Sequence, residues 1–195
     1  MKKEATDVRR TKLSILLIAL AASLATLLSQ PALAYYSVLG EATNVITSGD
    51  ISCKIIEKMG EGDFPQEGVY VRPGSIISKK VSVKNTGGHP FWLRVKLKNM
   101  MDGSDLSADI LELDINTTDW TEGGDGYFYY NKPVEPGAET EKLFTQVKIA
   151  GSAGNAYSGK SLKLSVCAYA VQSEYNTAAS PLEVIGWPAE NGGDA

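Results

Sequence analysis

Residues 91–98 alternate strictly between two kinds of side chain. The apolar set is Phe91, Leu93, Val95 and Leu97, and the set between them is Trp92, Arg94, Lys96 and Lys98. Successive side chains of an extended strand point to opposite faces, so the alternation places each set on its own face. Such a strand packs one face on a core and turns the other to solvent. The chain must therefore build a sheet whose apolar face is covered.

The same two-residue period recurs along most of the chain, and turn signals containing glycine or proline separate the segments. The expected strands are 51–55, 69–71, 77–84, 91–98, 111–115, 127–130, 143–149 and 161–171. The expected turns are 72–74, 85–88, 123–126 and 133–137. We predict one all-β domain over residues 49–188, a two-sheet antiparallel sandwich of jelly-roll or immunoglobulin-like type.

Residues 1–34 have the pattern of a cleavable signal peptide and are expected to form a signal helix. A basic start is followed by the uncharged apolar run 13–28, and then by Pro31 and the small-x-small pattern of Ala32 and Ala34. We predict cleavage after Ala34, which makes Tyr35 the first mature residue. An uncleaved anchor is the alternative, although a membrane span needs about 20 apolar residues. Membrane contact is expected only through the uncleaved signal peptide.

Charge is divided unevenly between the predicted signal peptide and the rest. The chain carries a formal net charge of −4, and residues 1–34 carry five basic against two acidic side chains, which leaves residues 35–195 at −7. A nucleic-acid-binding surface needs clustered basic residues, so we predict no nucleic-acid partner. The polar residues 189–195 are expected to form a disordered tail. These features favour a secreted protein that meets signal peptidase during export.

Several stretches, taken in order, resemble the camelysin/TasA family of exported proteins of spore-forming bacteria. They are 34–37, 42–51, 71–74, 81–87, 116–120, 127–132, 134–137, 168–173 and 186–188. The resemblance implies a jelly-roll sandwich, export through a dedicated signal peptidase, and a role either as a biofilm-matrix fibre subunit or as a casein-cleaving metalloprotease. One departure is that Gln30 and Pro31 stand where the family signal has a Gly-Thr pair.

Residues suited to catalysis or metal binding are scarce. His89 is the single histidine, no His-Glu-x-x-His pattern is present, and zinc enzymes draw on several such ligands. A serine or cysteine nucleophile would also need a base. Asp102, Asp105 and Asp109 suggest a calcium loop only loosely, because the EF-hand spacing is absent. We therefore predict no enzyme activity, no catalytic or metal site and no cofactor.

Cys53 and Cys167 lie in the first and last expected core strands and form a candidate disulfide. Export would permit the bond. However, Cys53 alternates in phase with Ile51 and Ile55, whereas Cys167 alternates out of phase with its apolar neighbours. The two thiols are therefore expected to point to different faces if both apolar sets face the core, and two separate thiols are the alternative.

Four aromatic residues around a glycine-rich turn are candidate ligand-binding residues. They are Trp120, Tyr127, Tyr129 and Tyr130. Exposed rings on a sandwich can hold sugar rings, while core and cross-strand packing is the ordinary role of such residues. A monomeric surface or carbohydrate-binding module is therefore the alternative to an assembly function.

The segment 35–48 is the main functional candidate. It is short, moderately apolar, and freed by the predicted cleavage, so it could add as a strand to an open sheet edge of another subunit. Tyr36, Val38 and Val45 are the expected anchors. Head-to-tail addition of this kind does not close and gives a filament. We predict a secreted fibre subunit of the cell surface or biofilm matrix, whose partners are copies of itself or other matrix proteins.

Overall fold

The structure, a computed structural model, describes residues 36–48, 51–101, 110–154, 157, 160–174 and 176–190. All of them belong to one compact unit, Ala34–Ala195. The predicted signal helix, the cleavage residues Ala32, Ala34 and Tyr35, and the aspartates of the loose calcium pattern lie outside the described residues. In the described part, no helix is long and apolar enough to cross a membrane.

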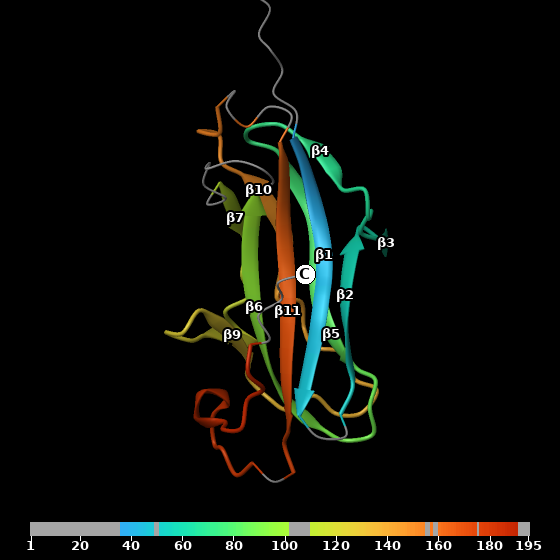
Figure 1. The fold of residues 1–195 in the computed structure, drawn as a ribbon, viewed down its shortest axis with the longest axis vertical. Helices are drawn as coiled ribbons and strands as arrows, with labels where there is room; N and C mark the ends of the chain where they lie inside the picture. Colours follow the sequence, from blue (N-terminus) through green and yellow to red (C-terminus); the bar gives the residue numbers. More distant parts are fainter. Residues whose placement is uncertain are drawn as a thin grey trace, which may run out of the picture. The chain divides into compact units, whose positions relative to one another are not determined.

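The first layer is a six-stranded sheet with the order β4-β1-β11-β6-β9-β8. Its strands are β1 (Tyr36–Ser48), β4 (Val69–Val71), β6 (Phe91–Met101), β8 (Trp120–Glu122), β9 (Tyr127–Tyr130) and β11 (Ser161–Gln172). The first and last long strands of the unit, β1 and β11, lie side by side along the middle of this layer (Figure 1).

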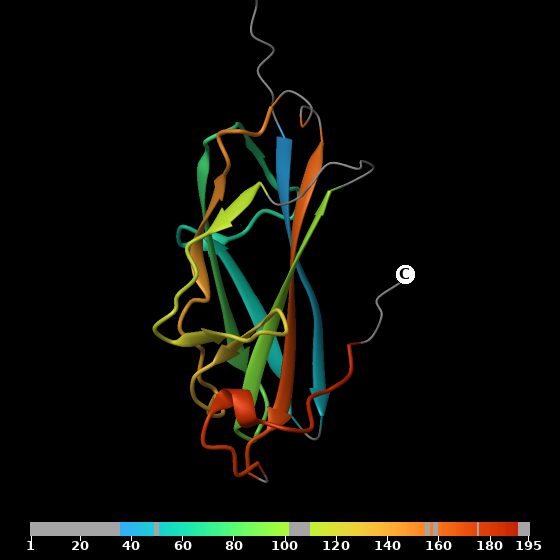
Figure 2. The same cartoon turned by 90° about the vertical axis from the view of Figure 1, so that its left-hand side faces the viewer.

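The second layer is a five-stranded sheet with the order β3-β2-β5-β10-β7. Its strands are β2 (Cys53–Met59), β3 (Gly62–Asp63), β5 (Ile76–Asn85), β7 (Leu111–Leu113) and β10 (Phe144–Ile149), and the short 3₁₀ turn η2 (Pro181–Glu183) follows β11. Figure 2 shows the two layers from the side. The all-β, two-sheet prediction is confirmed. Every strand pair is antiparallel except β1 with β11, which is parallel, so the fully antiparallel expectation is wrong at that pair.

The core lies between the two sheets and is built by the predicted alternation. In β6, Phe91, Leu93 and Val95 are buried in one cluster with the even-numbered residues of β11, such as Leu164 and Val166. Alternate residues of β5 close the cluster from the other sheet. The outer face of β11 is also buried, because residues 176–190 pack across it.

Asn85 fixes the turn between β5 and β6. Its side-chain amide donates to the carbonyls of His89 (2.8 Å) and Val134 (2.9 Å), and its carbonyl accepts from the Gly87 N–H (2.9 Å). A Cβ at Gly87 would lie 2.7 Å from the backbone nitrogen of Ser52, so only glycine fits there. This packing explains why the predicted turn carries these residues.

Candidate functional site

The candidate donor segment is paired within its own chain. β1 lies between β4 and β11, and its parallel register on β11 runs from Ser37 with Ser161 to Ser48 with Val171. On its other side, β4 pairs only with Tyr36–Val38. For the rest of β1, the described residues supply no strand on that edge. One edge of β1 is therefore paired along its length, and on the other edge the described residues pair only with Tyr36–Val38.

The register gives each expected anchor a Cα partner in a neighbouring strand. Val38 is the Cα partner of Leu162, and Val45 is the partner of Ala168; both β11 partners are buried in the main cluster. Tyr36 is the partner of the buried Val71 of β4. The register shifts between Ala42 and Val45, so two residues of β1 stand opposite one of β11. Such a bulge fixes one alignment of the strand.

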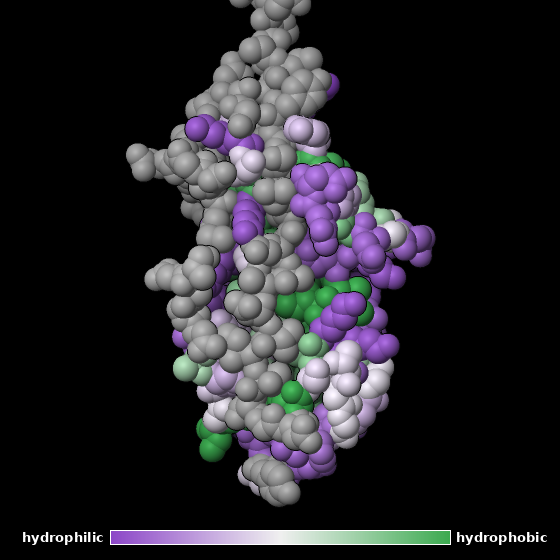
Figure 3. All heavy atoms as spheres, turned by 45° about the vertical axis from the view of Figure 1, so that its right-hand side comes forward, coloured by the Kyte–Doolittle hydropathy of each residue, from purple (hydrophilic) through white to green (hydrophobic). Residues whose placement is uncertain are grey.

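The side of the unit on which β2 and β3 lie is open at both sheet edges. β3 pairs only with Lys58 and Met59, so Cys53–Glu57 of β2 has no second strand partner among the described residues. Figure 3, which turns this side forward, shows mostly hydrophilic residues with a band of hydrophobic ones beside them.

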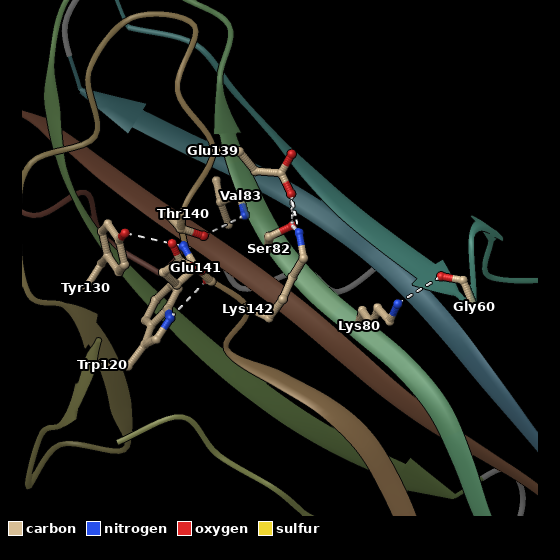
Figure 4. A network of polar contacts seen from close by, with 10 residues as sticks. All are labelled: Gly60, Lys80, Ser82, Val83, Trp120, Tyr130, Glu139, Thr140, Glu141 and Lys142. Atoms are coloured by element: carbon tan, nitrogen blue, oxygen red, sulfur yellow. Dashed lines mark hydrogen bonds and ion pairs between the residues drawn. The ribbon is translucent and has the colours of Figure 1, made fainter. Parts of the chain in front are cut away.

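The four candidate ligand aromatics divide between two places. Trp120 and Tyr130 lie in the core, with ring centroids 5.0 Å apart. The Trp120 Nε1–H donates to the Glu141 carbonyl (3.2 Å), and the Tyr130 hydroxyl accepts from the Glu141 N–H (3.3 Å), as Figure 4 shows. These two residues are packing residues and offer no ring face to a ligand.

Tyr127 and Tyr129 lie on the outer face of the six-stranded sheet, in a second cluster with Cys167 and Tyr169. Trp187 packs over them, with its ring 5.7 Å from that of Tyr129. Both tyrosines are buried. The packing alternative therefore holds for these two tyrosines: the rings are together, but the C-terminal segment covers them.

Arg94 lies at the centre of this outer cluster. Its guanidinium carbon is 3.9 Å from the ring centroid of Tyr127, 4.8 Å from that of Trp187 and 5.5 Å from that of Tyr169. Asp125 supplies the nearest carboxylate, at 3.7 Å. Burial would raise the pKa of Asp125, but hydrogen bonds from the Tyr129 hydroxyl and the Tyr127 N–H outweigh it and lower the pKa.

Glu190 closes the outer cluster from the C-terminal side. Its Oε1 is 2.5 Å from Lys96 Nζ and also accepts from the Tyr127 hydroxyl. The hydrogen bond from Lys96, followed by that from Tyr127, lowers the pKa of Glu190. Glu190 of the predicted disordered tail thus carries a defined contact, while 191–195 lie outside the described residues.

Sequence reasoning did not single out Arg94, Lys96, Tyr169, Trp187 or Glu190. The alternation of residues 91–98 places Arg94 and Lys96 on one outward face, and this pattern is the sequence feature that could have pointed to them. No periodic pattern links Trp187 or Glu190 to that face, because they belong to an irregular segment.

The candidate disulfide is not formed. Cys53 and Cys167 are both buried free thiols. Cys53 lies in the core between the sheets, and Cys167 lies in the outer cluster under the C-terminal segment. The expectation that they point to different faces is confirmed. Burial raises the pKa of Cys53 to about 12, which disfavours its thiolate.

A polar network ties the segment before β10 to the outer face of β5 (Figure 4). The Ser82 hydroxyl donates to Glu139 (2.5 Å), and Lys142 Nζ donates both to Ser82 Oγ (3.1 Å) and to Glu139. Thr140 accepts from the Val83 N–H (3.1 Å). These hydrogen bonds anchor the segment before β10 to β5.

His89 lies in an exposed turn, with its Nδ1 3.4 Å from Glu174 Oε1. Across the residues that the structure describes, no group of three or more His, Cys, Asp or Glu is placed to hold a metal ion. The described contact of His89 is thus with the exposed carboxylate of Glu174.

Three comparisons with known proteins returned nothing: no family model, no curated protein and no solved structure matches the chain.

Proposed function

We propose that this protein is a secreted structural subunit that assembles into an extracellular fibre by donating β1 to the next copy. The observation that carries the proposal is the pairing of β1, the first mature strand, along nearly the whole of β11. A segment that docks in its own chain also fits the same slot of an identical chain. Donation replaces one set of contacts by an identical set, so it costs little in binding free energy.

The connection after β1 supports the proposal. β1 ends at Ser48 in one sheet and β2 begins at Cys53 in the other, so four residues, 49–52, join the layers. Moving β1 out of its slot needs a change of direction in this connection and the loss of the short β4 pairing at Tyr36–Val38. Apart from β4, the sandwich is held by antiparallel pairs that do not involve β1, such as β6 with β11 and β2 with β5.

Processing is part of the same proposal. The predicted signal peptide ends just before β1, and cleavage after Ala34 would leave this strand with a free end. The jelly-roll assignment, the dedicated peptidase and the location in a biofilm matrix or at the cell surface belong to the proposal through the camelysin/TasA resemblance. Its partners are copies of the chain or other matrix proteins.

A cross-linking experiment tests the donation directly. Ser37 and Ser161 are Cα partners, and paired strands lie about 4.8 Å apart, within reach of a disulfide. Chains carrying Ser37→Cys are mixed with differently sized chains carrying Ser161→Cys, and the mixture is oxidised. Donation predicts a covalent heterodimer, because the two new thiols meet only when β1 of one chain lies on β11 of the other.

The matched control pairs Ser37→Cys with Ser165→Cys, which is four positions out of register and about 13 Å away along the strand. It should give no heterodimer. A Ser37→Cys/Ser161→Cys double variant that closes only within each chain, while the single variants never cross-link to each other, would overturn the proposal. Electron microscopy of residues 35–195, with and without extra residues before Tyr35, then tests whether a free end is needed for filaments.

A further inference from the structure

The outer face of the six-stranded sheet carries a cationic and aromatic surface that the assembly function does not use. We call it the Arg94 face; its residues are Trp92, Arg94, Lys96, Tyr127, Tyr129 and Tyr169. Residues 184–190 lie over it and are called the strap. The strap places the Trp187 ring against Arg94 and the Glu190 carboxylate against Lys96.

Two buried hydrogen-bond donors on this face have no acceptor among the described residues. They are Trp92 Nε1 and Arg94 Nε. Trp92 is 7% exposed and lies in a cluster with Val184 and Trp187 of the strap. A buried donor without a partner costs free energy, and native structures rarely keep one without a reason. Two such donors on one face of the sheet indicate that the face is suited to a ligand rich in oxygen acceptors.

The strap is held by side chains and not by strand pairing. Among the described residues, no backbone–backbone hydrogen bond joins 184–190 to the sheet. Its contacts are the Val184 and Trp187 packing, the Glu190 pair, and an Asn176 amide that donates to the Ile185 carbonyl (2.9 Å). Ile185 is exposed, and Gly186 has a positive φ of 81°. Terminal segments of this kind open at a lower free energy than the sheet beneath them.

From this geometry we propose that the Arg94 face binds a uronic-acid-containing glycan and that the strap is a displaceable cover occupying the site in its absence. Trp187 stands where a sugar ring would stack, and Glu190 stands where the sugar carboxylate would meet Lys96. The Tyr127 and Tyr129 rings supply the apolar surface that pyranose C–H groups pack on, and the two free donors meet sugar hydroxyls. Arg94 adds a second cation beside the sugar carboxylate.

The charge on the face selects an anionic sugar over a neutral one. Lys96 is paired with Glu190 and Arg94 lies near Asp125, so lifting the strap frees the Lys96 ammonium while Asp125 stays in place. A free ammonium under a cover favours a carboxylate, which restores the lost ion pair. A neutral glycan would leave Lys96 without a carboxylate and is expected to bind weakly.

The test measures binding of hexagalacturonate, by calorimetry, to the full chain and to a Trp187→Ala/Glu190→Gln variant. Removing the strap contacts should raise the affinity at least tenfold, and adding Arg94→Gln to that variant should abolish the gain. Glu183→Gln is the matched control, because the Glu183 carboxylate accepts from the Ala179 N–H within the strap's own loop and not from the sheet. It should bind like the unmodified chain.

A synthetic peptide of residues 184–190 gives a second readout, since it should compete with the glycan for the strap variant. If the double variant does not fold, Glu190→Gln alone keeps Trp187 packed and should still raise the affinity. Folded strap variants that bind no better than the unmodified chain, with no competition by the peptide, would overturn the proposal. Equal binding of a neutral glucan of the same length would overturn the anionic class of ligand. Neither result depends on filament formation.

Discussion

Lys79 of β5 and Glu57 of β2 form an ion pair that points into the sandwich, with 2.9 Å between Nζ and Oε2 and a Lys79 side chain that is 0% exposed. Lys79 alternates in phase with Ile77 and Val81, so the charge faces the core, where its Nζ lies 4.0 Å from the ring centroid of Phe64. Burial lowers the pKa of Lys79 although Glu57 opposes the shift.

The first prediction follows from this pair. Glu57→Gln should destabilise the unit by about 3–5 kcal/mol, because it leaves a buried ammonium without its carboxylate. The Lys79→Met/Glu57→Leu double variant removes both charges and should be near neutral or more stable. Urea unfolding at pH 7 measures both. A double variant that is as unstable as Glu57→Gln would mean that the pair stabilises the unit in some way other than by neutralising the buried charge of Lys79.

The second prediction uses the bulge in β1. Deleting Asn44 removes one of the two residues opposite Cys167 and lets β1 pair continuously, so filament formation and the Ser37–Ser161 cross-link should persist. Deleting Gly40 instead shifts Tyr36–Leu39 by one position and turns each side chain there to the other face. It should abolish the cross-link. The same outcome for both deletions would show that register does not govern β1.

The third prediction concerns acid. The pKa of Glu190 is lowered in the folded state, so its contact with Lys96 and Tyr127 stabilises the closed strap above the ordinary glutamate pKa of about 4.3 and is lost as pH falls through the lowered value. The indole N–H resonance of Trp187 should shift over that range. Glu190→Gln should lack the transition; an identical titration in both proteins would assign it to another carboxylate, such as Asp125.

The fourth prediction concerns the outer face of the five-stranded sheet, where Lys54 is the cross-strand partner of Lys84. Like charges in opposite positions repel, so Lys54→Glu should stabilise the unit by about 0.2–1 kcal/mol. Lys148→Glu is the opposite case, because Lys148 lies 2.7 Å from Glu112 and the change creates a repulsive pair. Thermal unfolding should move in opposite directions for the two variants.

The fifth prediction concerns the thiols. Since Cys53 is buried and its pKa is raised to about 12, iodoacetamide should label it only when the unit unfolds. Mild oxidation of the native protein should give no intrachain Cys53–Cys167 bond, because the two residues lie in separate clusters. Mass spectrometry checks both statements. Rapid labelling of Cys53 in the native state would contradict its placement in the core.

The sequence allowed the strands to be predicted where one face is buried, because a two-residue period reports burial directly. Phe91, Leu93 and Val95 follow it, and the same rule applied within 127–130 separates Tyr127 and Tyr129 from Tyr130. The parallel partner of β1 could not be predicted, since pairing between distant strands depends on packing that no local pattern records. The cover over Arg94 was missed for the same reason: an outward position says nothing of an irregular segment that later packs on it.

The pairing of β1 with β11 also sets the order in which the molecule can be completed. The strand nearest the start of the described chain has its principal partner in the last described strand, so the six-stranded sheet stays unfinished until residues 161–172 have been made. Contacts between such distant segments form slowly. Pairing of β11 with β1 and β6 is therefore expected to be a late step in the folding of the described unit.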